Sequence, residues 1–383
     1  MEFALDDEQR AIVDMARQFA DEVLRPFALK WDEDKHFPLD TLRDAGALGM
    51  GAMYVREQSG GSGLGRLEAA LVIEALATGC PTIAAYISIH NMVASMIDRF
   101  GSDDQRERFL PGLASMEALA SYCLTEPGAG SDAAALTTKA IRDGDHYVLS
   151  GQKQFISGAG ASAVYLVMAR TGGEGAKGIS AFLLSKDTPG LSFGAIERKM
   201  GWHAQPTRAV ILDGARVPVE NLLGAEGEGF RIAMAGLDGG RINIAAASLG
   251  GAQSAFDSTV DYMDERKAFG KPLHAFQALQ FRLAEMATDL EVARSFLWRA
   301  ASALDHGDAD AARLCAMAKL HVTDRCFEVA NQALQLHGGY GYLAEYGIEK
   351  IVRDLRVHQI LEGTNEIMRL IIGRSITGRA GDR

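Results

Sequence analysis

The sequence of 383 residues contains no long apolar run and no sustained basic run. No stretch approaches the roughly 18 apolar residues that a membrane-spanning helix requires. Lysine and arginine total 39 against 50 aspartate and glutamate residues, which gives a formal net charge of −11. Because nucleic acids are bound by clustered positive charge, this balance argues against a nucleic-acid partner. A hydrophobic content of 48% with 23% charged residues indicates a folded globular protein and excludes a disordered chain.

Cysteine is scarce, and its four positions are scattered. Cys80, Cys123, Cys315 and Cys326 include no close pair suited to zinc or redox chemistry, so we expect buried free thiols in a reducing compartment. The opening stretch MEFALDDEQR has neither the basic-then-apolar pattern of a secretory signal nor an Arg/Ser-rich transit pattern. From these features we expect a cytoplasmic protein.

Several widespread catalytic motifs are also missing. The nine histidines are dispersed and none has HExxH spacing, so the sequence predicts no metal site. It contains no GxSxG elbow and no Walker A loop, and the glycines between 60 and 65 match a dinucleotide fingerprint too loosely to count. The function therefore has to be sought in less common patterns.

Proline and glycine divide the chain into three zones. Apolar residues recur at helical spacing from 1 to about 117, with Pro26 ending the first run. Short β-branched runs between turns fill 119–224 and predict a small β-barrel or sandwich. No proline follows Pro272, which favours long helices in a bundle over the remaining residues. The predicted class is α+β, with domains at 1–118, 119–228 and 229–383.

The predicted elements follow from these patterns. Helices are expected from Pro38 to about 46 and at 67–77, 81–100, 242–266, 276–304, 309–336 and 362–376. Strands are expected at 146–149, 164–169, 179–184, 191–193 and 209–212.

Two segments at the entry to the β zone carry polar and aromatic groups in unusual settings. In YCLTEPGAGSD, at 122–132, the glycine-rich turn exposes amides and hydroxyls that could hold an anion or a ring edge. The alternative is a tight loop in which Ser131 or Asp132 caps the next element. In QFISGAG, at 154–160, Phe155 and Ser157 are either binding residues or simply a core aromatic and a surface serine.

Two further segments interrupt the helical zone. ERKAFGKP, at 265–272, ends a helix with basic residues that complement its dipole, and Arg266 is alternatively a phosphate ligand. QLHGGYG, at 335–341, contains glycines that permit close approach to a bound group, although a plain helix C-terminus explains them too.

The stretch HQILEGTNE, at 358–366, places Glu362 directly after Ile360 and Leu361. A carboxylate in a dry cavity acquires a raised pKa and can act as a base near neutrality. The alternative is that Glu362 sits at the positive N-terminus of the next helix.

Taken together and in this order, the segments resemble the acyl-CoA dehydrogenase family over essentially the whole chain. YCLTEPGAGSD matches one motif of that family, and the stretch from QLHGGYG to LEGT matches the other. The segments 86–92, 201–208, 236–243 and 357–363 are most similar to the branch that oxidises short branched acyl groups, with isobutyryl-CoA in valine degradation as the implied substrate.

The resemblance implies an N-terminal helical domain, a middle β-barrel and a C-terminal four-helix bundle, with FAD in the cleft between them and two dimers forming a tetramer. It places Tyr122, Leu124, Thr125, Phe155, Ser157, Thr364 and Glu366 around the flavin, and Ser131 at both the cofactor and the acyl-CoA phosphate region. Arg266, Phe269, Gln277, Gln335, Gly338 and Gly339 would reach the FAD phosphates and adenosine from a neighbouring subunit. Asp238, Arg241, Leu361 and Gly363 would contact the acyl-CoA.

The implied reaction removes the α-proton with Glu362 while the β-hydrogen leaves as hydride to FAD. The carbonyl oxygen would be held by the Glu362 backbone N–H and a ribityl hydroxyl of FAD. Electron-transfer flavoprotein would then re-oxidise the reduced flavin. Other hypotheses are a dehydrogenase of 2-methylbutyryl- or butyryl-CoA, an acyl-CoA oxidase, and a catalytically silent acyl-CoA-binding scaffold.

The chain departs from the pattern of many family members in two places, the motif at 200–207 and the residue before Glu362. His203 and Gln205 stand where the motif Met-Gly-x-Arg-x-Ser-x-Thr has Arg and Ser, which argues against a generic role for that arginine but fits the branch that oxidises short branched acyl groups. Leu361 precedes Glu362 where some straight-chain enzymes have Tyr, and a bulky apolar side chain there would shape a short acyl pocket.

Overall fold

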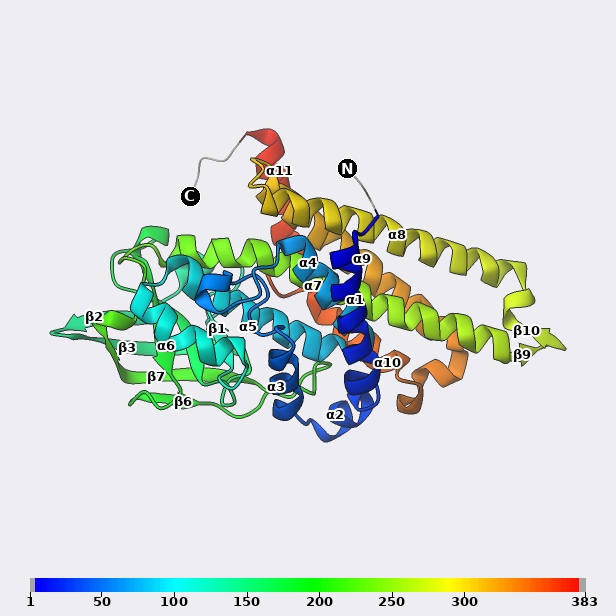
Figure 1. The fold of residues 1–383 in the computed structure, drawn as a ribbon, viewed down its shortest axis with the longest axis horizontal. Coiled ribbons are helices and arrows are strands. Elements are labelled where there is room, and N and C mark those ends of the chain that lie inside the picture. The colour runs from blue at the N-terminus through cyan, green and yellow to red at the C-terminus, as the bar shows by residue number, and fades with distance from the viewer. Residues whose placement is uncertain (1–3, 379–383) are drawn as a thin grey trace.

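The computed structural model describes residues 4–378, which form helices, then one large sheet, then long helices (Figure 1). The first helical part comprises α1 (Asp7–Phe19) with a π-helical turn at Ala20–Leu24, α2 (Ala28–Asp34), α3 (Leu39–Ala47), α4 (Arg66–Gly79), α5 (Pro81–Phe100) and α6 (Asp103–Ala114). The predicted α+β class is confirmed.

Helix ends in this part have clear local causes. The Asp6 carboxylate accepts a hydrogen bond from the Gln9 backbone N–H at 2.8 Å and caps α1. The helix predicted at 81–100 is α5, and Pro81 occupies its first position, where its missing N–H costs nothing. The first run ends before Pro26 as predicted, but the sequence analysis missed α2 and α6.

The middle of the chain forms one eight-stranded sheet. Its strands are β1 (Ala120–Cys123), β2 (Lys139–Asp143), β3 (His146–Ser157), β4 (Val164–Arg170), β5 (Ile179–Ser185), β6 (Leu191–Phe193), β7 (Thr207–Pro218) and β8 (Leu222–Leu223). They follow the order β6-β7-β3-β2-β4-β5-β8, with β1 parallel to β4. All five predicted strands exist, and three were missed: β1, β2 and β8.

Aromatic contacts across this sheet show that it curls around its own core. Tyr165 on β4 lies 5.2 Å, between ring centroids, from Phe193 on β6, although three strands separate β4 from β6 in the sheet. Tyr147 on β3 likewise meets Phe182 on β5 at 4.9 Å. Inward side chains of distant strands therefore share one buried cluster, as in a barrel.

The remaining chain consists of long helices and one small hairpin. They are α7 (Gly229–Glu265), β9 (Lys267–Ala268), β10 (Lys271–Pro272), α8 (Gln277–Asp305), α9 (Ala311–His337), α10 (Ile348–Arg356) and α11 (Asn365–Thr377). Helix α7 begins at Gly229, which is 13 residues before the predicted start at 242. Glycines near its N-terminus lower local helix propensity, and only tertiary packing makes that stretch helical. Helix α10 was not predicted.

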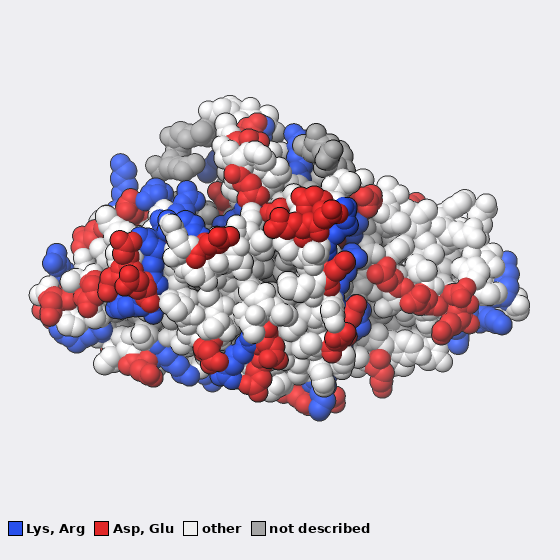
Figure 2. Space-filling view, viewed as in Figure 1, with Lys and Arg blue, Asp and Glu red and all other residues white. Residues whose placement is uncertain are grey.

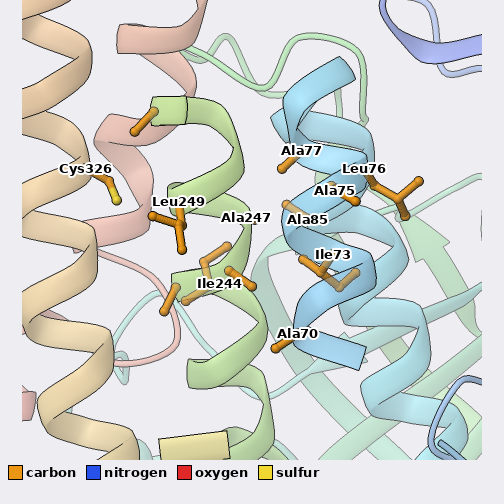
Figure 3. Packing of buried hydrophobic residues seen from close by; sticks show 14 of the residues in the cluster. Ala70, Ile73, Ala75, Leu76, Ala77, Ala85, Ile244, Ala247, Leu249 and Cys326 are labelled. Carbon is orange, nitrogen blue, oxygen red and sulfur yellow. The ribbon is translucent and has the colours of Figure 1, made fainter. Parts of the chain in front are cut away.

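Small residues let α4 and α5 approach α7 closely (Figure 3). Ala70, Ala77 and Ala247 line this contact with Ile73. A Cβ added at Gly250 would lie 2.0 Å from the Glu74 carbonyl oxygen, so only glycine fits there. This close packing joins the two helical parts and fixes α7 beside the loop that carries Glu362.

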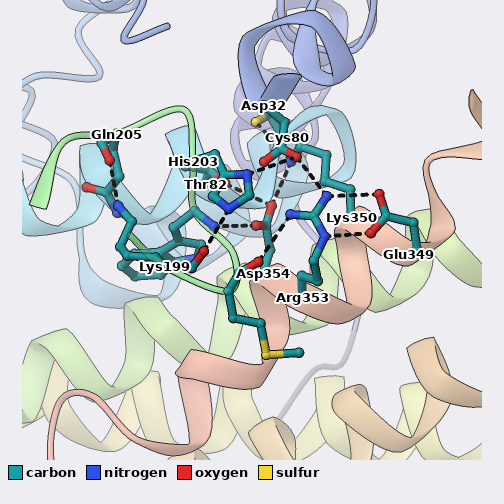
Figure 4. A network of polar contacts seen from close by, with 12 residues as sticks. Asp32, Cys80, Thr82, Lys199, His203, Gln205, Glu349, Lys350, Arg353 and Asp354 are labelled. Carbon is teal, nitrogen blue, oxygen red and sulfur yellow. Dashed lines mark hydrogen bonds and ion pairs between the residues drawn. The ribbon is translucent and has the colours of Figure 1, made fainter. Parts of the chain in front are cut away.

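A buried polar network joins α10 to the N-terminal helices (Figure 4). Asp354 accepts hydrogen bonds from the Trp202 backbone N–H at 2.6 Å, from Thr82 Oγ1 at 2.8 Å and from Lys350 Nζ at 2.6 Å. Arg353 in turn pairs with Asp32 at 2.7 Å. The network ties the loop at 201–205 to both helical parts.

Charged side chains of both signs are interspersed on the face drawn in Figure 2, which therefore carries no uninterrupted basic area. Across residues 4–378, no helix combines the length and apolarity needed to cross a membrane. The four cysteines are buried and free, as the sequence predicts.

Candidate active site

Glu362 lies in the loop between a short 3-10 turn, Val357–Gln359, and helix α11. Its φ of 57° and that of Gly363, 86°, make a sharp left-handed turn. The Thr364 hydroxyl accepts from the Ile367 backbone N–H at 3.3 Å and caps α11. The helix predicted from 362 thus starts at Asn365, and Glu362 lies two residues before its N-cap Thr364.

The carboxylate of Glu362 packs against α7. A Cβ added at Gly240 would lie 2.5 Å from Glu362 Oε2, so the glycine makes room for the carboxylate. Oε2 is buried, and no donor among the described residues bonds to it. Burial raises the pKa of Glu362 to about 7, against the opposing charges of Arg241 and Lys319. A carboxylate of this kind can take up a proton at neutral pH.

Two cations, Arg241 and Lys319, flank this loop, and only Arg241 was predicted as a site residue. Arg241 pairs with Asp238 at 2.6 Å, and its Nε lies 3.5 Å from the Glu362 carbonyl oxygen. Lys319 Nζ, on α9, donates to the Gly363 carbonyl oxygen at 2.7 Å. The available signal was helical spacing, because Lys319 lies on the same face of α9 as buried Cys315.

Two tyrosines also surround the carboxylate. The Tyr54 hydroxyl accepts from Asn243 Nδ2 at 3.1 Å, and the Arg66 guanidinium lies 3.6 Å from the Tyr54 ring centroid. The Tyr122 hydroxyl is buried and has no partner within the described part of the chain. Burial and then the Glu362 charge raise the pKa of Tyr122 well above its usual value. Tyr54 and Arg66 belong to no segment that carried the resemblance, whereas Asn243 ends the segment 236–243 but was not predicted as a site residue.

The two segments expected at the flavin ring lie side by side. The Gln154 backbone N–H donates to the Thr125 carbonyl oxygen at 2.8 Å. A register shift between Lys153 and Ile156 leaves Phe155 at φ 59° with 65% of its surface exposed. Bulges of this kind redirect a side chain, so the alternative that Phe155 is a core residue is wrong. Ser157 ends the same strand and is partly exposed.

A buried ion pair also joins the two segments that carry Thr125 and Phe155. Lys153 Nζ bonds to Glu126 Oε1 at 2.8 Å and to the Leu124 carbonyl oxygen at 3.1 Å. Ser131 and Asp132 are exposed beyond it, and Asp132 makes no side-chain capping bond, which excludes it as the cap of the next turn.

A second group of predicted residues gathers elsewhere. Arg266, Gln335, Gly338 and Gly339 line a cavity of about 570 Å³. Phe269, in the β9–β10 hairpin, is 95% exposed, and Gln277 begins α8 nearby. Figure 1 places this hairpin and the sheet at opposite ends of the molecule. Within one chain, these residues therefore do not lie beside Phe155.

The remaining predicted residues lie close to Glu362 in the sequence or on α7. Leu361 packs against the helical core, and Glu366 points out from the first turn of α11. Burial raises the pKa of Asp238, and its partner Arg241 opposes that shift.

The two departures from the motif belong to the network of Figure 4. His203 Nε2 lies 2.9 Å from the Lys199 carbonyl oxygen, and its Nδ1 lies 3.5 Å from Asp32. Gln205 is buried, and its amide finds no partner within residues 4–378. Neither residue is among the groups that raise or lower the pKa of Glu362.

Three family models cover nearly all of the chain. The acyl-CoA dehydrogenase N-terminal domain matches residues 6–117, the middle domain 121–215 and the C-terminal domain 227–377. The chain belongs to the acyl-CoA dehydrogenase family. It is therefore an oxidoreductase, and its family depends on FAD.

Individual relatives agree with this assignment. Isobutyryl-CoA dehydrogenase, mitochondrial, from Dictyostelium discoideum is 56% identical over 97% of this chain and 90% of its own. The solved structure of butyryl-CoA dehydrogenase from Megasphaera elsdenii gives a TM-score of 0.95 at 37% identity, covering 98% of this chain and 100% of that one. A structure described as the electron transferring flavoprotein of Acidaminococcus fermentans gives a TM-score of 0.96 at 40% identity. The match covers 98% of this chain and 99% of that one.

Proposed function

We propose that this acyl-CoA dehydrogenase oxidises a short branched acyl-CoA, isobutyryl-CoA first, to the 2-enoyl-CoA, with Glu362 as the base. The observation that carries the proposal is the buried, unpartnered Oε2 of Glu362, together with the burial that raises the pKa of this carboxyl to about 7. The name of the Dictyostelium relative supports the substrate. Leu361 before the base agrees with a short pocket, although one methylene changes binding by only about 1–3 kcal/mol.

The residues present fit FAD. Exposed Phe155, with Ser157 beside it, provides a surface for a ring, and the buried Tyr122 hydroxyl lacks a partner within the described chain. Leu124, Thr125, Thr364 and Glu366 complete the proposed flavin surface. When bound, FAD supplies the two-electron acceptor for the hydrogen that leaves the β-carbon.

The loop geometry suits proton removal. Glu362 takes the α-proton, and burial of its carboxylate disfavours the charged form and makes the group more basic. The backbone N–H of Glu362 donates no hydrogen bond within residues 4–378 and is free to hold the thioester carbonyl oxygen. Negative charge that develops on this oxygen would be stabilised by that donor.

The remaining contacts of the substrate are assigned to α7 and the loops. Arg241, Asp238 and Ser131 would hold the CoA portion, and Leu361 and Gly363 would contact the acyl group. Three domains, 1–118, 119–228 and 229–383, would enclose these sites; residues 1–3 and 379–383 lie outside the described chain. Arg266, Phe269, Gln277, Gln335, Gly338 and Gly339 would bind the adenosine half of FAD in a neighbouring subunit of a homotetramer.

Electron-transfer flavoprotein is the proposed electron acceptor, and the similar Acidaminococcus structure, described as an electron transferring flavoprotein, supports this proposal. The proposed location is the cytoplasm, and four free thiols agree with a reducing compartment. Cell fractionation tests the location, and reduction of an added electron-transfer flavoprotein during turnover tests the acceptor.

The first test is an anaerobic visible spectrum of the purified protein before and after isobutyryl-CoA is added. Near-complete bleaching of the flavin band supports both cofactor and substrate. A flavin band that bleaches only with butyryl- or 2-methylbutyryl-CoA moves the substrate to that acyl group. Peroxide formed during aerobic turnover without another acceptor would instead identify an oxidase, and a protein that binds no FAD would indicate a silent scaffold.

The second test is Glu362→Gln, which keeps the size of the side chain but cannot accept the proton. We expect turnover to fall by at least about 10³-fold, because the base is lost, while FAD and acyl-CoA still bind. Stopped-flow flavin reduction and ligand titration measure the two properties separately. Near-normal flavin reduction in this variant would show that another group is the base.

A further inference from the structure

Lys319 is a buried cation that the proposed mechanism does not use. Its side chain is 0% exposed in the middle of α9. Its Nζ donates to the Gly363 carbonyl oxygen at 2.7 Å and to Asn365 Oδ1 at 2.7 Å. Both acceptors are uncharged; Gly363 lies in the loop that carries Glu362, and Asn365 is the first residue of α11, which follows that loop. Burying a charged lysine away from water costs free energy. We therefore expect the charge of Lys319 to serve the site.

Residues of α9 close to Lys319 also bind the chain on both sides of the Glu362 loop. Asn365 Nδ2 donates to Thr323 Oγ1 at 3.0 Å and to Asp324 Oδ1 at 2.7 Å. Gln359 Nε2 donates to the same Asp324 oxygen at 2.7 Å. Glu362, with its positive φ, lies between these anchored flanks. Such a backbone conformation persists only where surrounding contacts enforce it.

The charge of Lys319 also acts on the base. The groups that face Glu362 are Arg241 on α7, Lys319 on α9, Tyr54 in the loop after α3 and Tyr122 on β1. Burial lowers the pKa of Lys319 to about 7, so Lys319 carries its charge mainly below that pH; the charges of Glu362, Asp324 and Glu366 oppose this shift, and that of Arg241 adds to it. Arg241 is already paired with Asp238, so Lys319 is the cation whose charge no carboxylate neutralises by a hydrogen bond.

We propose that Lys319 is a positioning residue that holds the Glu362 loop through the Gly363 carbonyl and keeps the Glu362 carboxylate ionised in its dry cavity. The inference rests on the proposed role of Glu362 as the base. Lys319 touches neither substrate nor reacting atoms and acts only through the loop and its charge. Removing the charge takes away an influence that lowers the pKa of Glu362, so that pKa rises above about 7.

The test is the pH profile of kcat/KM for the FAD-loaded enzyme with isobutyryl-CoA. In the natural protein, kcat/KM should rise as pH rises through about 7, because only ionised Glu362 can accept the proton. In Lys319→Met, we expect this rise to move upward by about one pH unit or more, with about a tenfold loss at pH 6 that shrinks toward pH 9. Lys319→Arg, which keeps the charge, should restore the position of the rise.

The matched control is Lys350→Met. Lys350 is also buried, but it pairs directly with Asp354 in the network of Figure 4 and is absent from the groups that act on Glu362. Its loss should lower thermal stability and leave the midpoint of the pH profile in place. Lys319→Gln keeps a donor for the Gly363 carbonyl without the charge, so it reports the same shift if the Met variant does not fold.

A second measurement is independent of turnover. Infrared difference spectra across the pH range follow the protonated carboxyl band that Glu362→Gln removes. We expect this band to persist to higher pH in Lys319→Met than in the natural protein. An unchanged band and pH profile in both neutral variants, with Glu362→Gln inactive, would overturn the role of Lys319 alone. An active Glu362→Gln would instead overturn the proposed base.

Discussion

At the scale of single residues, this site is built from groups whose neighbours are far away in the sequence. Glu362 was identifiable because it follows Ile360 and Leu361 within a family motif. Its cavity is completed by Gly240 on α7 and Tyr54 near the N-terminus, which no local pattern connects to it. The sequence therefore points to Glu362 as the proposed base, but not to what surrounds it.

Gly240→Ala tests whether the position of the Glu362 carboxylate depends on the absence of a side chain at residue 240. The added Cβ would lie 2.5 Å from Glu362 Oε2, so the carboxylate must move away from its present place. We expect kcat to fall by about 10²-fold, as displacements near 1 Å can cause, while the thermal midpoint stays close to that of the natural protein. Steady-state kinetics and thermal melts measure the two effects.

The control for this substitution is Gly373→Ala on α11, where an added Cβ meets nothing within 4 Å. Alanine has higher helix propensity by up to about 1 kcal/mol, so this variant should be at least as stable and fully active. Equal activity of both alanine variants would contradict the role given to Gly240.

At the scale of elements, the long helices and the β-branched strands were readable from periodicity. The predicted 81–100 is α5, and 191–193 is β6. The missed elements have physical reasons. Strand β1 is only four residues long and is held by parallel pairing with β4. The N-terminal stretch of α7 is rich in glycine and is helical because other helices pack against it.

His90 shows how such elements are joined and gives a prediction for pH. On α5, it bonds through Nε2 to the Leu113 carbonyl oxygen at 2.8 Å and accepts from the Ala120 backbone N–H at 3.1 Å. Burial lowers its pKa from 6.5 to about 4. The unfolded chain therefore binds a proton that the folded chain does not between those pH values. Its contribution to stability is complete above about pH 6.5 and is lost as pH falls to 4.

The loss amounts to about 3 kcal/mol in the free energy of unfolding. Urea unfolding at pH 7 and pH 4.5 should show a smaller pH-dependent drop for His90→Gln than for the natural protein. His36→Gln, at an exposed histidine, is the control and should behave like the natural protein. An identical drop in all three proteins would exclude His90 as a source of acid sensitivity.

At the scale of the whole molecule, the proposed cofactor residues form two groups. Phe155 and Ser157 lie on the sheet, whereas Arg266 and Gln335 line a cavity near the hairpin at the other end (Figure 1). If both groups bind one FAD, they come from different chains. Arg266 would then act in the site of its neighbour.

Co-expression of Arg266→Ala with Glu362→Gln tests this arrangement. In a hybrid assembly, a subunit carrying Arg266→Ala keeps its own Glu362 and receives Arg266 from the neighbour, so one complete site forms. We expect activity well above that of either variant alone, together with bound FAD in the hybrid. Activity no greater than the sum of the two separate variants would show that Arg266 serves the site of its own chain.

The sequence by itself determined the order of helical and β zones, the two family motifs and the identity of Glu362, because these depend on local periodicity and on residues adjacent in the chain. Only the tertiary structure decided the environment of that carboxylate. Lys319, Gly240 and Tyr122 reach it from three separate elements. The pKa of a buried group depends on desolvation and on charges in space, and no linear pattern records either.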